Sequence, residues 1–464
     1  MGIADWSAML GVLVLVALIN WRGQRSKQDS VGDYLFAGRN TGVFALMATL
    51  VMTELNTSTM VGFATLGYLD GYRAISLASV FLFGLLFYSL VVARRWKRYD
   101  GFSVSGYFSD RYHPMLGQLA ALVLFVAMAG FSANYIKSLA LLMQPLFPSV
   151  SLPLVSALFS ILVLALVLRG GLRAIIGFDR LSFLLVLLFV PALYYFSRQL
   201  GGGAELPPIQ FGHLSSQFVW SLVIITCMTY ILAPWYGQKI FAAHRERTAL
   251  WAMLICSVFV FLLYAGIIAA AAEVRRQGVV LADPQQVIPY LVANGLPPYI
   301  RGASYALLFC IAATTLAGVW SAMVSIILGP GVLGTHRQQG SSSTGMLWTL
   351  GCALLSWLGA TFFVDHILDK MILMNIPISA LAFSLLAGFY WKRVSTPSAL
   401  VSILVGLIGG FYCYFAYSEA TYSWYWAVYA IPASFIAGAV WTWLSGYFGG
   451  SSVQQEVSCR LEGK

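Results

Sequence analysis

Long apolar stretches separated by short polar ones make up most of this chain. Windows of about 20 apolar residues, each long enough for a helix to cross a bilayer, predict thirteen membrane spans. They cover residues 4–22, 43–69, 73–93, 115–143, 151–168, 175–199, 215–242, 247–272, 302–332, 345–364, 367–390, 397–417 and 424–447. The pattern therefore predicts an all-α, multi-pass protein that is integral to the cell (inner or cytoplasmic) membrane and surrounded by lipid.

One predicted span, residues 43–69, carries a polar cluster at its centre. The run from Thr53 to Thr59 reads TELNTST and includes Glu54 and Asn56. Charged and polar side chains at this depth must face protein or water, and Asn, Ser and Thr compete for backbone hydrogen bonds. We therefore expect this helix to be unwound at its centre, as in secondary transporters, where a broken helix exposes carbonyl oxygens to an ion and a substrate.

Composition and charge agree with a membrane protein. The 464 residues are 59% hydrophobic and 9% charged, with a mean hydropathy of +0.80. The net charge of +10 comes from basic residues scattered between the apolar runs, so we expect no nucleic-acid partner. Lys and Arg concentrate in the predicted loops of one side, with Arg94, Arg95 and Lys239 among them, and this bias predicts the N-terminus outside and the C-terminus inside.

The sequence lacks the motifs of several functional classes. The sequence contains no GxxxxGK[ST] and no GxGxxG after a strand, so ATP-driven pumping is disfavoured. The five histidines show no catalytic spacing, and the six cysteines show no metal-ligand spacing. We expect a protein that is not an enzyme and has no cofactor.

Four motifs in register resemble the sodium/solute symporter family, whose members include sodium-coupled sugar, proline, sialic acid and choline carriers. They are Asp33–Arg39 (DYLFAGR), Gly170–Ala174 (GGLRA) followed by Asp179, Gly237–Ala243 (GQKIFAA), and Gly388–Arg393 (GFYWKR) followed by Ala399 and Gly406. The similarity extends from about residue 30 to residue 415.

The resemblance implies a LeuT-like core of two inverted five-helix repeats. It divides the chain into a leader span and loop (1–42), a first repeat (43–200), a second, inverted repeat (201–394), two peripheral spans (395–448) and a cytoplasmic tail (449–464). Residues 43–69, 215–242 and 302–332 become core helices 1, 6 and 8.

The resemblance also implies a sodium site between core helices 1 and 8. Its ligands would be the carbonyls of Met52, Leu55 and Ile311 and the hydroxyls of Thr314 and Thr315. Sodium is the only metal that we expect. The alternative is that the two threonines only bond to the preceding turn of their own helix or join helices together. A second sodium is disfavoured because Ala317 and Gly318 stand where two-sodium relatives have hydroxyls.

Three charged residues are candidates for the ion path or for coupling. Asp179 could attract sodium, or pair with Arg180 or Arg173. Glu54 could be a counter-charge to sodium, hold a cationic substrate group or bind a proton. It could also pair with Lys137, which lies within the predicted core helix 3 (residues 115–143).

The substrate pocket is expected near the break. Ala78 and Gly237 stand where sugar carriers place hydrogen-bonding side chains, so a sugar is disfavoured. Aromatic rings beside the Glu54 carboxylate suit an ammonium group, although 15% of the chain is aromatic and such rings are common at membrane interfaces. The candidates are Asn56, Thr59, Phe63, Trp235, Tyr236, Gln238, Trp320 and Asn375.

The expected function is sodium-coupled symport, with import of a small polar organic solute by alternating access. An amino acid, an amine and a carboxylate all remain open as the solute. The alternatives are a proton-coupled carrier of the same fold and a transporter-derived nutrient sensor, against which the lack of an output domain argues. We expect a monomer or a weak oligomer.

Overall fold

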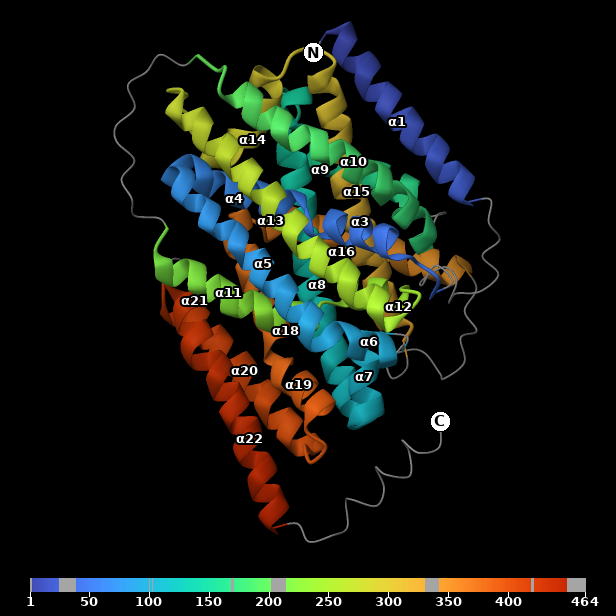
Figure 1. The fold of residues 1–464 in the computed structure, drawn as a ribbon, viewed down its shortest axis with the longest axis vertical. Coiled ribbons are helices and arrows are strands. Elements are labelled where there is room, and N and C mark those ends of the chain that lie inside the picture. Colours follow the sequence, from blue (N-terminus) through green and yellow to red (C-terminus); the bar gives the residue numbers. More distant parts are fainter. Residues whose placement is uncertain are drawn as a thin grey trace.

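The computed structural model describes residues 2–24, 39–99, 101, 103–167, 171–201, 214–329, 342–418 and 421–448 (Figure 1). Every named element in these ranges is helical, and the one β-type pairing within them is an isolated bridge between Thr41 and Ala243. Residues 33–38 of the first motif and the predicted tail from residue 449 lie outside the described residues.

The helices follow the predicted order. The first predicted repeat contains α3 (Val43–Glu54), α4 (Thr57–Asp70), η2 (Gly71–Leu77), α5 (Ala78–Tyr88), η3 (Ser89–Ala93), α6 (Arg94–Tyr99), α7 (Val104–Arg111), α8 (Pro114–Met143), η4 (Gln144–Leu146), α9 (Leu152–Val167) and α10 (Gly171–Ser197). The second contains α11 (Ser216–Tyr230), α12 (Pro234–Phe241), α13 (Glu246–Arg276), η5 (Pro284–Gln286), α14 (Val287–Tyr290), η6 (Leu291–Gly295), α15 (Ile300–Ile327), α16 (Ser342–Phe362), α17 (Ile367–Leu373), α18 (Asn375–Ala380) and α19 (Ala382–Tyr390). Outside the repeats are α1 (Ile3–Gln24), α20 (Thr396–Ala416), α21 (Tyr422–Tyr425), η7 (Trp426–Ala430) and α22 (Ile431–Phe448).

Helical segments occupy all thirteen predicted ranges. In the described part of the chain, nine helices are long and apolar enough to cross a membrane, or ten if the bent pair α11 and α12 is counted as one span. Three shorter apolar helices add to these: Ile3–Val16, Val43–Glu54 and Leu152–Ala165. The multi-pass, all-helical class is confirmed, whereas the number thirteen, the orientation of the termini and the domain boundaries stay predictions.

Two helices at corresponding positions of the two repeats are broken. The break expected in 43–69 is confirmed: α3 ends at Glu54 and α4 begins at Thr57. A second break, which the hydrophobic pattern did not predict, separates α11 from α12, whose axes differ by 48°. Pro234 opens α12 and disfavours a helical conformation for the residue before it. Because α3 and α12 contact each other and both contact α15, the two breaks meet near one helix.

The burial of the helices separates a core from a periphery. In α15, 94% of the most apolar window is buried, against 33% in α20. In Figure 1, α1 lies at one edge of the bundle, and α20 and α22 lie together at the opposite edge. Other helices therefore surround α15, while α20 and α22 expose much of their apolar surface, which lipid would cover.

The amphipathic sequence of residues 284–292 predicts a short helix lying on the surface, and the segment is helical as η5, α14 and the start of η6. Its apolar residues Val287, Ile288 and Leu291 are fully buried, and the segment contacts α4 and α8. The segment therefore packs into the bundle, and the predicted surface location is wrong.

The leader helix α1 is fixed to α15 at two neighbouring points. The Arg301 guanidinium donates to the Asp5 carboxylate, with Nη2 to Oδ2 at 2.5 Å and Nε to Oδ1 at 3.1 Å. Next to this pair, a Cβ added to Gly302 would lie 1.9 Å from the Asp5 carbonyl oxygen. The absence of a side chain at Gly302 thus allows the two backbones to approach.

We expect Gly302→Ala to destabilise the protein by about 1–3 kcal/mol, the usual range for an added methyl group with no room. The clash is with backbone, which cannot turn aside as a side chain can. Gly318→Ala on the same helix is the control, because nothing lies within 4 Å of its added Cβ. Thermal melting of the purified variants measures the effect; equal melting temperatures for the two would show that α1 does not pack this closely.

Candidate functional site

The break in core helix 1 is held open by its own polar residues. Asn56 caps α4: its side-chain Oδ1 accepts from the backbone N–H of Thr59 at 2.8 Å, and its Nδ2 donates to the Glu54 carbonyl at 2.9 Å. The Tyr264 hydroxyl also donates to the Glu54 carbonyl, at 2.7 Å. In a continuous helix, the backbone N–H of Asn56 would donate to the Met52 carbonyl. Here it donates to the Glu54 carbonyl instead. The Met52 carbonyl therefore lacks its usual helical partner.

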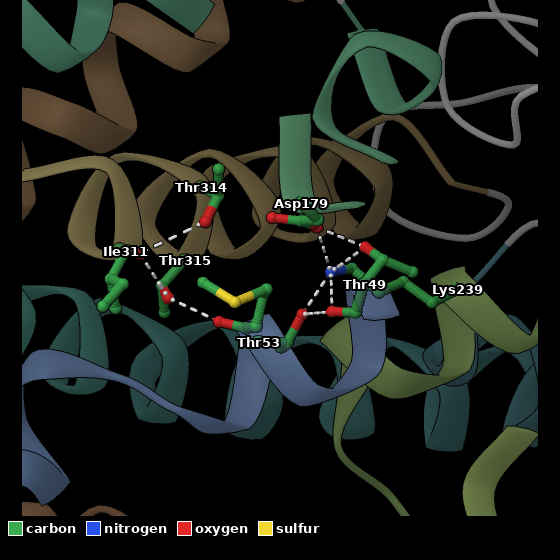
Figure 2. Close-up of polar contacts among 8 residues, drawn as sticks. Thr49, Thr53, Asp179, Lys239, Ile311, Thr314 and Thr315 are labelled. Atoms are coloured by element: carbon green, nitrogen blue, oxygen red, sulfur yellow. Dashed lines mark hydrogen bonds and ion pairs between the residues drawn. The ribbon is translucent and has the colours of Figure 1, made fainter. Parts of the chain in front are cut away.

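Four of the five predicted sodium ligands lie together at this break, and Figure 2 labels three of them, Ile311, Thr314 and Thr315. The Thr315 hydroxyl lies 2.9 Å from the Ile311 carbonyl and 3.4 Å from the Met52 carbonyl, and the Thr314 hydroxyl lies 3.2 Å from that of Ile311. Both threonines are buried. The fifth, Leu55, is fully buried beside the break, and no hydrogen bond joins its carbonyl to α15.

The bonds to Ile311 are those that ordinary membrane threonines make within their own helix. The contact between Thr315 and Met52 goes further, because it joins α15 to the broken end of α3. A small cluster of hard oxygens from two helices is suited to a sodium ion, since hydroxyl and carbonyl oxygens can both turn a lone pair toward a cation.

Asp179 lies beside this cluster in a second polar group. Figure 2 shows it between Thr314 on one side and Lys239 on the other. The Lys239 ammonium lies 3.4 Å from Asp179 Oδ2, which also accepts a hydrogen bond from the Thr49 hydroxyl. Of the two partners considered for Asp179, Arg180 is exposed, and the side chain of Arg173 lies outside the described residues, so that pairing stays untested. Lys239 was predicted in a loop, but it lies on the helix α12 and its side chain is 2% exposed.

Glu54 does not pair with Lys137. Its Oε1 accepts a hydrogen bond from the Tyr230 hydroxyl, at the end of α11. Lys137 lies on α8, partly exposed, and makes no ion pair with Glu54. The pairing considered from the sequence is therefore wrong, and among the described residues the Glu54 carboxylate has the phenol of Tyr230 and no basic side chain as a partner.

A pocket opens over Glu54 between helices of the two predicted repeats. Residues from α3, α4, α5, α8, α11, α12, α17 and α18 line it: Thr53, Glu54, Asn56, Thr59, Phe63, Val80, Phe81, Phe131, Tyr135, Leu222, Ile225, Thr226, Tyr230, Trp235, Met371, Ile372 and Asn375. The set contains six aromatic rings, one carboxylate and no Lys, Arg or His. Its charge is therefore negative or neutral, according to the protonation of Glu54.

Five of the eight substrate candidates line this pocket: Asn56, Thr59, Phe63, Trp235 and Asn375. The other three do not. Gln238 donates to Ser321 at 2.9 Å, Trp320 donates to Ser356 at 3.1 Å, and Tyr236 is buried among aromatic rings.

Sequence reasoning missed the tyrosines that hold the site. Tyr230 and Tyr264 bond the carboxylate and the carbonyl of Glu54, from helices far away along the chain. The position of Tyr230 shortly before Pro234 could have marked it as a site residue, because a helix break there places polar groups inside an apolar span. Nothing in the local sequence distinguishes Tyr264, which lies within the continuous helix α13.

Comparisons with known proteins agree with this geometry. The family model of the sodium:solute symporter family matches residues 34–406. The sodium/pantothenate symporter of Haemophilus influenzae is 22% identical over 412 residues, which cover 83% of this chain and 84% of that protein. A solved structure of a Na⁺-coupled sialic acid symporter, in a substrate-bound outward-open state, superposes with a TM-score of 0.78 at 16% identity, over 96% of this chain and 98% of that one.

The family match spans most of the chain, and the structural likeness shows that the fold is that of a LeuT-like transporter. The chain therefore belongs to the sodium:solute symporter family.

Proposed function

We propose that this protein couples the entry of a sodium ion to the uptake of a small organic solute that carries an amine or a quaternary ammonium group. The observation that carries the solute class is the Glu54 carboxylate, which lies in an aromatic pocket whose lining includes no basic side chain. Alternating access between the two repeats would move both ligands.

The sodium ion would bind to the carbonyls of Met52, Leu55 and Ile311 and to the hydroxyls of Thr314 and Thr315. Support comes from the contact between Thr315 and Met52, which brings α15 to the broken end of α3. One charge that crosses 100 mV contributes about 2.3 kcal/mol, before any concentration gradient is counted. One sodium ion per cycle would therefore support useful accumulation of the solute.

The solute would bind on the other side of the same break. Ring faces attract a cation, and Phe63 and Phe81 form a wall with centroids 5.3 Å apart, while Phe131 and Trp235 form another at 5.3 Å. The Glu54 carboxylate would supply the opposite charge, and the amides of Asn56 and Asn375 would supply hydrogen bonds. An anionic solute would meet Glu54 without a compensating cation, which is unfavourable at low dielectric.

Pantothenate and sialic acid, the solutes named for the two relatives, are carboxylates. The pocket of this chain does not favour such a group, and for this reason we propose neither of them as its solute.

Coupling would follow from the shared helix end. Met52 and Leu55 belong to the sodium site, and Glu54 and Asn56 belong to the solute pocket, within five consecutive residues. An ion that orders the break would fix the direction of the Glu54 side chain. Sodium would thus raise the affinity for the solute, and by linkage the solute would raise the affinity for sodium.

A second candidate function rests on the same carboxylate. Glu54 is 4% exposed and hydrogen-bonded to Tyr230, with no ion pair, so it could also carry a proton. A proton-coupled carrier would lose its pH dependence in Glu54→Gln and would show no requirement for sodium.

We expect the double change Thr314→Ala and Thr315→Ala to raise the sodium concentration for half-maximal uptake at least tenfold, which corresponds to about 1.4 kcal/mol. Both hydroxyl ligands would be lost. Thr349→Ala is the matched control, since this hydroxyl bonds only the preceding turn of α16. An unchanged sodium dependence in a folded double variant would contradict the assignment.

We expect Glu54→Gln to weaken binding of a cationic solute by about 10–100-fold, since a hydrogen bond to a charged group contributes about 1.5–3 kcal/mol. The measurement is the melting temperature of the purified protein in potassium, in sodium, and in sodium with a panel of amines, amino acids and carboxylates. In wild type, an amine should stabilise only when sodium is present. In the variant, sodium should still stabilise and the amine should not.

Glu246→Gln, in an exposed ion pair with Arg98, serves as the control for loss of one carboxylate. Stabilisation of the wild type by an anionic carboxylate, or an undiminished effect of the amine on Glu54→Gln, would refute the proposed solute class.

A further inference from the structure

Lys239 fills a cage of oxygen atoms. Its ammonium lies 2.9 Å from the Thr49 carbonyl, 2.7 Å from the Thr49 hydroxyl and 3.4 Å from Asp179 Oδ2, and it also donates to the Thr53 hydroxyl (Figure 2). The oxygens come from α3 and α10, and the lysine comes from α12. Carbonyl, hydroxyl and carboxylate oxygens around one positive centre form the environment that a monovalent cation would also need.

The cage is closed to water in the described structure. The side chains of Lys239 and Asp179 are 2% and 0% exposed. Two opposite charges buried together leave no net charge, whereas either one alone would be buried and uncompensated. An ionised Asp179 therefore needs a cation at this position, whether or not that cation is attached to the chain.

The other oxygen of the Asp179 carboxylate supports a cation site independently. Asp179 Oδ1 is buried and has no hydrogen-bond partner. Figure 2 shows the residue between Lys239 and Thr314, so the carboxylate stands between the cage and the proposed sodium site. An oxygen with unused lone pairs at this point could contribute to a cation on either side.

We propose that the cage formed by Thr49, Thr53 and Asp179 is a second monovalent-cation site, which the ammonium of Lys239 occupies as a tethered cation. The wild-type chain then needs no free ion at this place. Removal of the lysine side chain leaves a cavity that accepts a free ammonium ion or a sodium ion. This inference goes beyond the sodium site at Thr314 and Thr315, and its test is a binding measurement that does not require transport.

Two variants of Lys239 distinguish the effect of an open cage from the effect of losing the lysine charge. Lys239→Ala opens the space and leaves all of the oxygens. Lys239→Met removes the charge but fills most of the space with an apolar chain. The double change Lys239→Ala and Asp179→Asn removes both charges, so it requires no cation and keeps the protein measurable if the single variants are unstable.

The experiment compares melting temperatures in ammonium chloride and sodium chloride with those in N-methylglucamine chloride at equal ionic strength, after purification in ammonium. A cation that binds only the folded state raises the melting temperature in proportion to the logarithm of its concentration. We expect ammonium to stabilise Lys239→Ala by several degrees more than wild type. Lys239→Met and the double variant should show only the wild-type response.

Three results would overturn the proposal. The first is an ammonium response of Lys239→Ala equal to that of wild type. The second is an equal rescue of Lys239→Met, which has no open cage. The third is failure of Lys239→Ala to fold even in ammonium while the double variant folds. Because each response is measured relative to wild type in the same salt, loss of the sodium site at Thr314 and Thr315 would not produce any of these results.

Discussion

The need to satisfy backbone polar groups inside a membrane governs the centre of this structure. A helix interrupted in hydrocarbon must find new partners for its free N–H and C=O groups. At the end of α3 the Asn56 side chain and the Tyr264 hydroxyl supply partners for the Glu54 carbonyl and for the start of α4. The Met52 carbonyl is left facing α15, where the Thr315 hydroxyl approaches it. The exposed carbonyl that an ion would use is thus a consequence of how the break is stabilised.

The buried charged residues on the two sides of this break have different kinds of partner. On one side, Lys239 and Asp179 neutralise each other and tie α12 to α10 and α3. Breaking such a pair by removing one partner typically costs about 3–5 kcal/mol, so the contact ties α12 to α10 and α3 only while both charges are present. On the other side, Glu54 has the Tyr230 hydroxyl and no basic partner, and it faces the pocket. Under the proposed function, this carboxylate without a counter-charge would be the place for a cation that binds and leaves, whether that is an ammonium group or a proton.

Much of this arrangement could be predicted from the sequence, and the remainder could not for physical reasons. The apolar windows predicted the helices, and the TELNTST run predicted the first break, because both signals are local. The convergence of Thr314 and Thr315 with Met52 rested on the family resemblance. The partner considered for Glu54 was wrong, and the lysine beside Asp179 was not among the partners considered, since pairing depends on contacts between helices. Asp179 lies against a lysine 60 residues away, and Glu54 accepts a hydrogen bond from a tyrosine 176 residues away.

The measurement that tests the central claim most directly is the equilibrium binding of radioactive sodium to the purified wild-type protein. The account has one free sodium site at the break and a second cation site that Lys239 occupies, so we expect saturable binding of about one ion per chain. An equal concentration of potassium should not displace this ion. The double alanine variant of Thr314 and Thr315 should not bind it. Absence of saturable binding would contradict sodium coupling at the break. Binding of two ions per chain would contradict the tethered cation.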